Sequence, residues 1–353
     1  MEFLQIPLEG NEQALLQLYH DVYADTPDRI PSLEELCWRF GGHVHPVRIW
    51  VARDAGNIVG LRPLALHTMQ LGKSVYPALH MLNVMVHPAY QGKGVFRSLM
   101  SLAWEKHGEE GVLAFTFPNE NSTKAYRKWK EWFRLAELPL YIRMIPPKDF
   151  SEEKSLARFI AGYGVVAARS LRINKPVAKD MTVQLVDALD EGIDALWQNN
   201  RHFFDLMIPR DRAYLTWRYV ERPDVQYQIY KGVVQGKTVG YLVTRTRIMF
   251  GMHLGLIVDF FVENNERALL SALIQRASAD LIEQGVHAMG LQFIGPDSLK
   301  RSLWDNGFFA VPKQLLPREF PMFARRGELI AGDVKSLSDC RSMCFTWGDN
   351  DAV

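Results

Sequence analysis

The order of apolar and polar positions along the chain predicts one α/β arrangement that occurs twice. Between residues 82 and 118 an apolar strand, "NVMV", leads through a polar loop into a segment with helical spacing, "VFRSLMSLAWEKHG", and then a second strand, "VLAFTF". Residues 256–294 repeat this order with "LIVDFFV", "ALLSALIQRASADLIEQG" and "AMGLQFI". Apolar residues of the second helix recur every three or four positions, as in a helix that buries one face. This stripe comprises Leu270, Leu273, Ile274, Ala277 and Leu281.

The two stretches correspond at a constant offset of 174 positions, which places Val84 opposite Val258 and Leu99 opposite Leu273. Upstream, "GNIVGL" at Gly56 and "GKTVGY" at Gly236 each predict a tight hairpin turn before a strand. A duplicated unit of this kind predicts an α/β fold, with an α+β type of mixed sheet in each of two similar domains.

The segment between the repeats has the character of a boundary. "MIPPKDFSEEKS", which starts at Met144, combines a proline pair with a cluster of charges. We therefore expect a first domain at residues 1–145, a linker region at 146–180 and a second domain at 181–353. Near the C-terminus, "MCFTW" predicts a final strand.

Composition limits the partners of the protein. The 353 residues are 48% hydrophobic and 23% charged, and the formal net charge of +1 gives no overall attraction to nucleic acid or to an anionic membrane. We find no signal-peptide pattern and no apolar run long enough to span a bilayer. The three cysteines, Cys37, Cys340 and Cys344, are too few for a disulfide framework. These features predict a cytoplasmic protein that binds neither nucleic acid nor membrane, and they leave its oligomeric state open.

The loop "QGKG", which follows the first strand, has the properties of a phosphate-binding site. Amides at a helix N-terminus lack intrahelical partners and carry partial positive charge. Gly92 and Gly94 remove the Cβ atoms that would hold an anion away, and Lys93 adds a cation. The two glycines would also suit a simple tight turn, so the loop alone leaves both interpretations open.

The duplicate of this loop lacks those properties. At the same offset "QGKG" becomes "NERA", residues 265–268, in which both glycines are lost and Glu266 introduces a carboxylate. The sequence therefore predicts that only the first domain binds an anionic ligand.

The segment "VMVHPAYQGKGVF" resembles the acetyl-CoA-binding motif of the GNAT superfamily N-acetyltransferases, written Q/R-x-x-G-x-G/A. The motif falls on Gln91, Gly94 and Phe96, where Phe replaces the usual small residue and crowds the start of the helix. The resemblance implies a tandem GNAT arrangement with a degenerate second domain and acetyl-CoA as co-substrate. It assigns acetyl-CoA binding to ten residues: Val84, Met85, Val86, Gln91, Gly92, Lys93, Gly94, Val95, Phe96 and Asn121.

The next element is similar to the family's helix that carries a tyrosine. "FTFPNENSTKAYRKWKEWF" supplies Asn121 and Tyr126, whereas alignment of "STKAY" with "SLKRS" puts Ser302 opposite Tyr126 in the second repeat. The resemblance implies that Tyr126 protonates the departing thiolate, and that backbone N–H groups around Val84 to Val86 polarise the thioester carbonyl.

The general base is less well defined. The strand before the loop offers His80, whose unperturbed pKa lies near neutrality, although a histidine at a strand start can be structural and a relayed water serves equally well. Tyr126 can likewise be an ordinary core aromatic. His43 and His45 lie two positions apart without a third ligand near them in sequence, so we expect no metal site.

The leading functional hypothesis is an N-acetyltransferase that moves an acetyl group from acetyl-CoA to a primary amine by direct attack in a ternary complex. The acceptor is a small molecule or a sugar amine. The first alternative is a non-catalytic acyl-CoA-binding module, which Phe96 and the absence of a strand carboxylate keep open. The second is a Fem-like aminoacyl transferase, which would need a basic tRNA surface and a helical arm that the sequence does not show.

Overall fold

The computed structural model describes residues 1–42, 44–145, 178, 180–249, 251–316, 318–327 and 342–350. Contacts between residues divide the chain into two compact units, each assembled from separate parts of the sequence. Unit 1 comprises Met1–Ala136, Glu221–Val225 and Pro321–Lys335. Unit 2 comprises Glu137–Val220, Gln226–Phe320 and Ser336–Val353.

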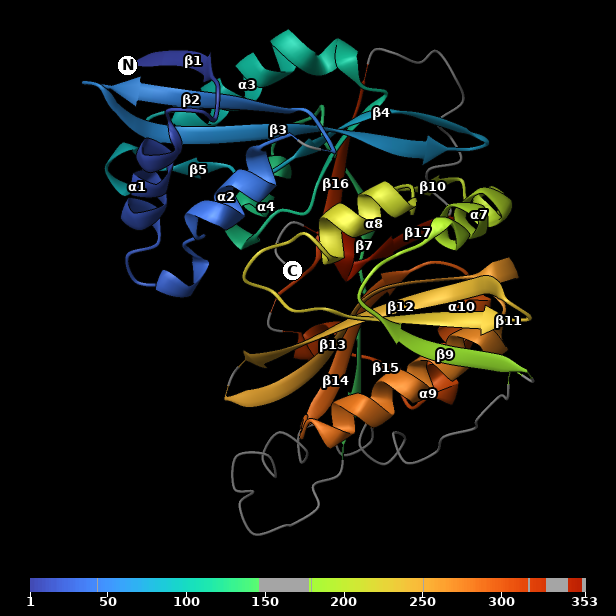
Figure 1. Cartoon of the computed structure of the whole chain (residues 1–353). Helices are drawn as coiled ribbons and strands as arrows, with labels where there is room; N and C mark the ends of the chain where they lie inside the picture. The colour runs from blue at the N-terminus through green and yellow to red at the C-terminus, as the bar shows by residue number, and fades with distance from the viewer. Residues whose placement is uncertain are drawn as a thin grey trace. The chain divides into compact units, whose positions relative to one another are not determined.

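Unit 1 is a mixed sheet with helices on both faces (Figure 1). Its helices are α1 (Glu12–Val22), α2 (Leu33–Phe40), α3 (Val95–His107) and α4 (Glu120–Tyr126). Its strands are β1 (Glu2–Ile6), β2 (Val47–Asp54), β3 (Asn57–Leu71), β4 (Ser74–Met81), β5 (Met85–Val86), β6 (Leu113–Thr116), β7 (Phe133–Glu137) and β16 (Pro321–Arg326). Antiparallel pairing joins β1 to β2, β2 to β3 and β3 to β4, and β4 pairs in parallel with β6.

Unit 2 repeats this plan. Its helices are α7 (Glu191–Asn200), α8 (Arg212–Tyr219), α9 (Arg267–Glu283) and α10 (Asp297–Asp305). Its strands are β8 (Leu140–Met144), β9 (Met181–Val186), β10 (Leu206–Met207), β11 (Gln228–Val234), β12 (Lys237–Met249), β13 (Met252–Val262), β14 (Ala288–Ile294), β15 (Phe309–Ala310) and β17 (Met343–Thr346). Antiparallel pairing joins β9 to β11, β11 to β12 and β12 to β13, and β13 pairs in parallel with β14. The duplicated α/β fold is thus confirmed, as is the expected strand at "MCFTW".

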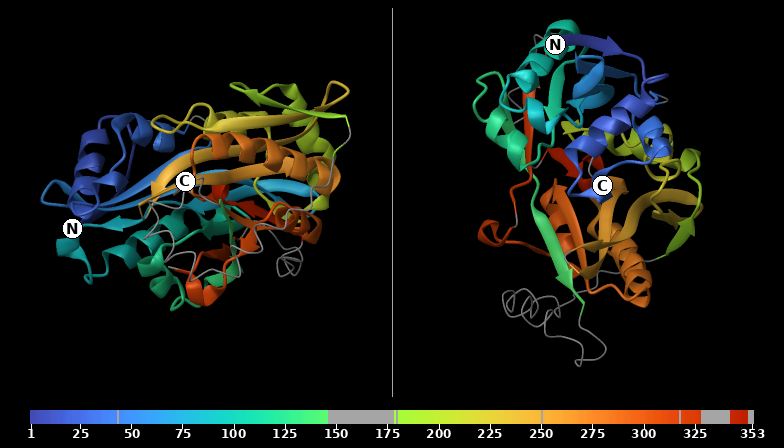
Figure 2. Two further views of the ribbon diagram at one scale, coloured as in Figure 1. Left: turned by 90° about the horizontal axis from the view of Figure 1, so that it is seen from below. Right: turned by 90° about the vertical axis from the view of Figure 1, so that its left-hand side faces the viewer.

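Each sheet is completed by a strand of the other sequence repeat. In unit 1 the strand β16, which belongs in sequence to the second repeat, pairs with β6, from Phe323 opposite Thr116 to Arg326 opposite Leu113, and also with β7. In unit 2 the strand β8, which belongs in sequence to the first repeat, pairs with β14 from Ala288 opposite Met144 to Gln292 opposite Leu140. Figure 2 shows the green strand β8 beside the orange β14. The domain boundaries predicted at residues 145 and 181 assumed that each domain is one unbroken segment, and they stay predictions. Of the predicted linker region, residues 146–177 and 179 lie outside the described residues.

Both predicted hairpin turns have the backbone that a two-residue connection requires. Ala55 and Gly56, with φ of 47° and 87°, join β2 to β3, and Gln235 and Gly236, with φ of 48° and 81°, join β11 to β12. Positive φ at both central residues is typical of the type I′ turn, whose twist matches that of the two strands. Long hairpins follow in both units, each with one register shift near the turn, between Ala52 and Arg53 and between Gly232 and Val233.

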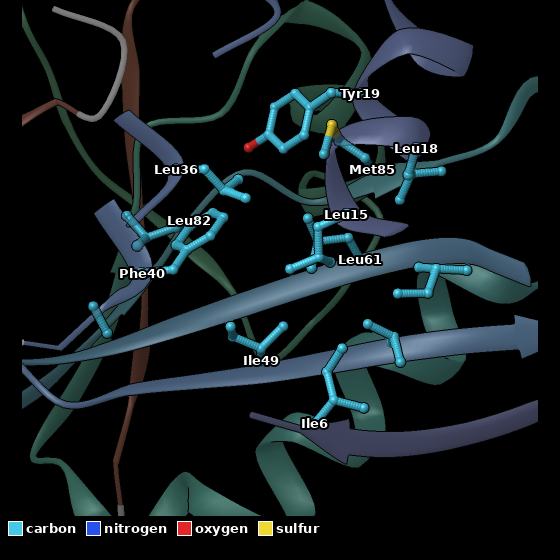
Figure 3. Packing of buried hydrophobic residues seen from close by; sticks show 13 residues of the cluster. Ile6, Leu15, Leu18, Tyr19, Leu36, Phe40, Ile49, Leu61, Leu82 and Met85 are labelled. Atoms are coloured by element: carbon cyan, nitrogen blue, oxygen red, sulfur yellow. The ribbon is translucent and has the colours of Figure 1, made fainter. Parts of the chain in front are cut away.

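The core of unit 1 lies on both faces of the sheet. On one face α1 and α2 pack against β2 and β3, and Figure 3 shows this cluster, to which Leu82 and Met85 also belong. On the other face Val95, Leu99 and Ala103 of α3 pack against β2 and β3. Full burial of Leu99 and of its counterpart Leu273 fixes the equivalent helices α3 and α9 to their sheets.

The strand exchange predicts that residues 1–145 do not fold alone, because β6 then lacks β16 and leaves an unpaired apolar edge. Leu138 donates its N–H to the Phe320 carbonyl at 3.0 Å, so an Asn-Gly turn can join these two residues. A chain of residues 1–138, this turn and residues 320–327 would therefore retain β16. We expect this chain to unfold cooperatively in urea, as measured by near-UV circular dichroism. The same chain with Phe323→Asp is the control and should not, whereas cooperative unfolding of residues 1–145 alone would contradict the role of β16.

Candidate functional site

The predicted loop in unit 1 is a left-handed turn that only glycine adopts at low cost. Gly92 and Gly94 have φ of 73° and 82°, and a Cβ added at either position would meet no atom within 4 Å. Both residues are exposed, so the loop presents bare backbone to solvent. Since space is free at both positions, backbone conformation and not crowding is the local reason for glycine.

Side chains anchor this loop to the β2–β3 hairpin. The Tyr90 hydroxyl donates to Asp54 Oδ2 at 2.8 Å, and Asp54 Oδ1 lies 3.3 Å from the N-terminal amine. The Tyr90 hydrogen bond, followed by the N-terminal amine, lowers the pKa of Asp54. Lys93 Nζ lies 5.1 Å from the centre of the Tyr90 ring, and Gln91 Nε2 donates to the Val86 carbonyl at 3.3 Å. The loop is therefore held in one conformation before any ligand arrives.

Helix α3 begins at this turn with its amides uncapped. Gly94 is the N-cap and provides no side-chain hydrogen bond, and the first turn contains no acidic residue. The helix runs for 13 residues, long enough for the partial positive charge of its N-terminus to develop. Val95, which is 2% exposed, packs into the core and fixes where the helix starts. These features suit the pyrophosphate of a nucleotide.

The strand before the loop is broken, which the sequence did not predict. We expected one strand over "NVMV", but β4 ends at Met81 and β5 covers Met85 and Val86 alone. Asn83 between them has φ of 20°, and the buried guanidinium of Arg62 donates to the Leu82 carbonyl at 3.0 Å. Such a break releases backbone groups from the ladder.

The break also separates neighbouring strands. β4 pairs with β6 at Leu79–Ala114 and His80–Phe115, whereas β5 pairs with β3. Pairing with β6 thus stops just before Val84, Met85 and Val86, the predicted carbonyl-polarising positions. Their amides lie at the point where two parallel strands part.

Phe96 lies within an aromatic cluster and not against the loop. Its ring stacks on Trp129 with centroids 5.2 Å apart and planes at 18°, and it meets the Tyr126 ring edge-on at 6.4 Å. The large residue at the motif's small position therefore fills space between α3 and the segment after α4. Asn121, another predicted binding residue, is exposed on the first turn of α4.

Tyr126 ends α4 and is 1% exposed. Its ring lies 4.8 Å from Trp132 and 5.7 Å from Phe323, and its hydroxyl donates to Met100 Sδ at 3.9 Å. A thioether is a weak acceptor, so this hydroxyl gains little from its present partner. The predicted acid role stays a prediction, and the surroundings match an aromatic core equally well.

His80 lies in β4 on the opposite face of the sheet from Met81 and is 4% exposed. Its ring stacks on Phe115 at 4.4 Å and lies 5.3 Å from His67, whose ring is 3.9 Å from His45. The structure thus groups His80, the candidate base, with two further imidazoles but does not bring it together with Tyr126. His43 lies outside the described residues.

In unit 2 the corresponding helix start has no glycine and is bridged to the neighbouring helix. Asn264 and Asn265 take the left-handed conformation, and the exposed Glu266 is the N-cap of α9. Arg267 forms a bidentate ion pair with Asp305 of α10. Where α3 of unit 1 begins with uncapped amides, unit 2 has the carboxylate of Glu266 and an ion pair that joins α9 to α10.

The C-terminal strand closes the remaining gap in unit 2. β13 and β14 pair in parallel only from Leu254 to Leu256, and farther along β14 the strand β17 pairs with it. From β17, Thr346 Oγ1 donates to Asp259 Oδ1 of β13 at 3.0 Å. Strand β17 near the C-terminus therefore spans β13 and β14, whereas β5 and β6 of unit 1 are paired with other strands and not with each other.

A buried ionic cluster supports this closure and was missed in the sequence. Arg210, 1% exposed, donates from Nη2 to Asp349 at 2.7 Å, and its Nε lies 3.2 Å from Asp259. Burial raises the pKa of Asp259, and the Asp349 carboxylate adds to this shift. Asp259 corresponds to Met85 at the offset of 174, so a carboxylate on this strand does occur in the chain, but in the second repeat.

No group of three or more possible metal ligands occurs among the described residues. No helix in the same part of the chain is long and apolar enough to cross a membrane. Cys37 and Cys344 are free thiols, and Cys340 lies outside the described residues.

Residues 8–130 match the family model of the acetyltransferase (GNAT) domain. Residues 8–130 therefore have the sequence pattern of a GNAT domain. The match ends just after Tyr126 and contains the loop, the strand break and α3. No curated protein sequence matches the chain.

Solved structures share the fold over nearly the whole chain. A probable N-acyltransferase of unknown function from Enterococcus faecalis V583 has a TM-score of 0.60 at 14% identity, covering 93% of this chain and 73% of its own. A tandem GNAT protein from the clavulanic acid biosynthesis pathway has a TM-score of 0.53 at 15% identity, covering 92% and 98%. Saccharomyces cerevisiae N-myristoyltransferase with bound myristoyl-CoA has a TM-score of 0.56 at 11% identity, covering 92% and 82%. The tandem GNAT fold predicted from the sequence is confirmed.

Gly94→Ala should weaken binding of coenzyme A at least tenfold, because a Cβ costs roughly 1–2 kcal/mol in the left-handed conformation and displaces the α3 amides. Gly285→Ala is the matched control, since Gly285 has φ of 78°, equally open space and a position at the far end of α9. Isothermal titration calorimetry and thermal unfolding separate the effects. Equal coenzyme A affinities for the two variants would refute the assignment.

Burial lowers the pKa of His45 from its ordinary value near 6.5 to about 4. The unfolded chain then binds more protons than the folded one below about pH 6.5, so stability is retained above that pH and lost as the pH falls toward 4. Between pH 7.5 and 5.0 we expect His45→Gln to lose less free energy of unfolding in urea than the wild type, by up to about 2 kcal/mol. An identical loss in both proteins would show that His45 does not titrate in this way.

Proposed function

We propose that unit 1 is an N-acetyltransferase that moves an acetyl group from acetyl-CoA to a primary amine of a small molecule or sugar by direct attack in a ternary complex. The observation that carries this proposal is the rigid, acid-free glycine turn at the start of α3, directly after the strand break. It lies within the part of the chain that matches the GNAT domain model. The described residues of unit 2 lack each of these features.

The residues present fit acetyl-CoA. The amides at Gly92 to Phe96 would hold its pyrophosphate, with Gln91, Lys93 and Asn121 at the rim, because the exposed turn presents backbone without side chains at Gly92 and Gly94. Acetyl-CoA supplies the activated acyl thioester. Backbone amides around Val84, Met85 and Val86 would orient and polarise its carbonyl, since this segment follows the point where β4 and β6 stop pairing.

Two side chains would move protons. His80 is the candidate base for the acceptor ammonium, alone or through a water. Tyr126 would protonate the thiolate, which requires its hydroxyl to leave Met100 Sδ. Holding amine and thioester in line would provide much of the acceleration.

The burial of Tyr126 and the stacked Phe96–Trp129 pair favour one other candidate, a module that binds acyl-CoA without turnover. An aminoacyl transferase of the Fem-like type has no such support. The cytoplasmic location stays part of the proposal, consistent with two free cysteines among the described residues.

Thiol release from acetyl-CoA with a panel of amino sugars, amino acids and polyamines tests the proposal. With an active amine, Tyr126→Phe should lower kcat by about 10²–10⁴ with little change in KM or in melting temperature, because among the described residues its hydroxyl has only a sulfur partner. Tyr19→Phe, a buried tyrosine of the opposite core cluster, is the control and should retain kcat. An unchanged kcat in Tyr126→Phe would assign that residue to packing, and tight binding without thiol release for every amine would establish the binding module.

A further inference from the structure

Residues 343–350, which we call the strap, join two strands of the sheet in unit 2. They comprise β17 and the short 3₁₀ helix η9 (Trp347–Asp349), followed by Asn350. The strap pairs with β14 and with β10 through short ladders: Phe293–Thr346 and Ile294–Phe345 with β14, and Leu206–Met343 and Met207–Cys344 with β10. Because these ladders are short, the side chains around the strap decide how firmly it is held.

Helix α8 holds the backbone of the strap. Arg218 donates from Nε to the Gly348 carbonyl at 3.0 Å and from Nη2 to the Asn350 carbonyl at 2.6 Å. Arg39, which has the same place in "WRF" of unit 1 as Arg218 has in "WRY", instead pairs with Glu35 of its own helix at 2.6 Å. The two repeats thus share this arginine, but in unit 2 it binds the strap.

The strap packs closely against α8 and yet leaves polar atoms unpaired. A Cβ added at Gly348 would lie 1.9 Å from the Tyr219 hydroxyl, so a larger residue does not fit there. That hydroxyl and Asp349 Oδ1 are buried, and neither has a hydrogen-bond partner among the described residues. Opening the strap would return both atoms to water, which lowers the free-energy cost of its release.

Two carboxyl groups meet one guanidinium between the strap and β13. Arg210 Nη2 donates to Asp349 Oδ2 at 2.7 Å, and Arg210 Nε lies 3.2 Å from Asp259 Oδ2. Tyr241 donates to Asp259 Oδ2 at 3.0 Å, and Thr346 donates to Asp259 Oδ1 at 3.0 Å. The three charged side chains are at most 2% exposed. Solvent therefore screens the two carboxyl groups from each other only weakly.

Further titratable or charged groups lie around this pair on α8, β12 and β17. They are Tyr214, Arg218, Tyr219, Tyr241 and Cys344. Burial raises the pKa of the three phenols and of the thiol, so these groups stay neutral, whereas the arginines stay charged. Burial also raises the pKa of Asp259, which Arg210 opposes and the Asp349 carboxylate reinforces. Asp259 is therefore the group in this cluster whose charge changes.

We propose that the strap closes with uptake of a proton by Asp259 and is released when that proton is lost. With the proton present, one acid and one carboxylate share Arg210; without it, two buried anions face each other. A carboxyl group that binds its proton more tightly in the closed strap stabilises that state at low pH, and this stabilisation is lost as the pH rises. Release would free the edge of β14 that β17 occupies. This device does not depend on acyl transfer in unit 1.

Cys344, 1% exposed within the strap, can report its release through its rate of reaction with dithiodipyridine, which reacts with accessible thiols at acid pH as well. Full-length protein with Cys37→Ser and Cys340→Ser retains this thiol alone. Dividing its rate by that of the urea-unfolded protein at the same pH gives the open fraction of the strap. We expect this fraction to rise at least tenfold between pH 4.5 and 8.0, because one proton is released on opening.

Three variants of this protein test the cause. Asp259→Asn removes the titrating carboxyl group and should make the open fraction low and independent of pH. Gly348→Ala changes no charge and should raise the open fraction at every pH while keeping its pH dependence. The matched control is Asp194→Asn, which removes a half-exposed carboxylate that pairs with Arg212 of the same unit at 3.7 Å. It should behave as the protein with Asp194, and near-UV circular dichroism confirms that each variant is folded at both pH values.

A second thiol separates release of the strap from unfolding of unit 2. Ser271 is fully buried on α9, and Ser271→Cys in a chain without the native cysteines should react at least tenfold more slowly than Cys344 at pH 8.0. Equal rates for the two thiols would assign the reaction to unfolding and overturn the proposal. A pH-independent open fraction in the protein with Asp259, or the same response in Asp194→Asn and Asp259→Asn, would also overturn it.

Discussion

The candidate site depends on the place where β4 stops pairing with β6. Between parallel strands that stay paired, the backbone N–H and C=O groups are hydrogen-bonded to each other. A ligand can then contact only the side chains of these strands. In unit 1 the chain stops pairing with β6 after His80 and pairs with β3 at Met85 and Val86. It then turns through two glycines in the left-handed conformation into α3. The Arg62 guanidinium stabilises this break from inside the protein by taking up the Leu82 carbonyl. Without the break, the uncapped amides of α3 would adjoin a closed sheet.

The two units show how one fold keeps or loses a binding surface. Their strands and helices follow the same order, and Leu99 and Leu273 are buried at equivalent places. The differences concentrate where a ligand would lie in unit 1. There, unit 2 has Glu266, the Arg267–Asp305 pair and a strand of its own tail, fixed through Thr346 to Asp259. Unit 2 has gained contacts within itself at the positions where unit 1 presents open backbone.

The sequence predicted the fold well because periodicity and turn residues act locally. The repeat, the helices at α3 and α9, the hairpins at Gly56 and Gly236 and the glycine loop all follow from neighbours in the chain. The strand break could not be predicted in this way, since "NVMV" has the pattern of a strand. Only the position of Arg62 in the folded protein reveals the interruption. The cavity lined by Trp104, Trp129 and Arg325 could not be predicted either, because Arg325 lies more than two hundred residues beyond Trp104 in sequence. The imidazole group around His80 likewise joins residues from separate strands, and periodicity carries no information about it.

The exchange of terminal strands has a consequence for synthesis on the ribosome. β6 leaves the exit tunnel long before β16, its sheet neighbour, has been translated. At about 5–20 residues per second, the intervening polypeptide takes on the order of ten seconds or more to make. During that interval the nascent chain carries an incomplete sheet with an apolar margin, which makes it a natural client for a chaperone that shields strand edges until translation is nearly finished.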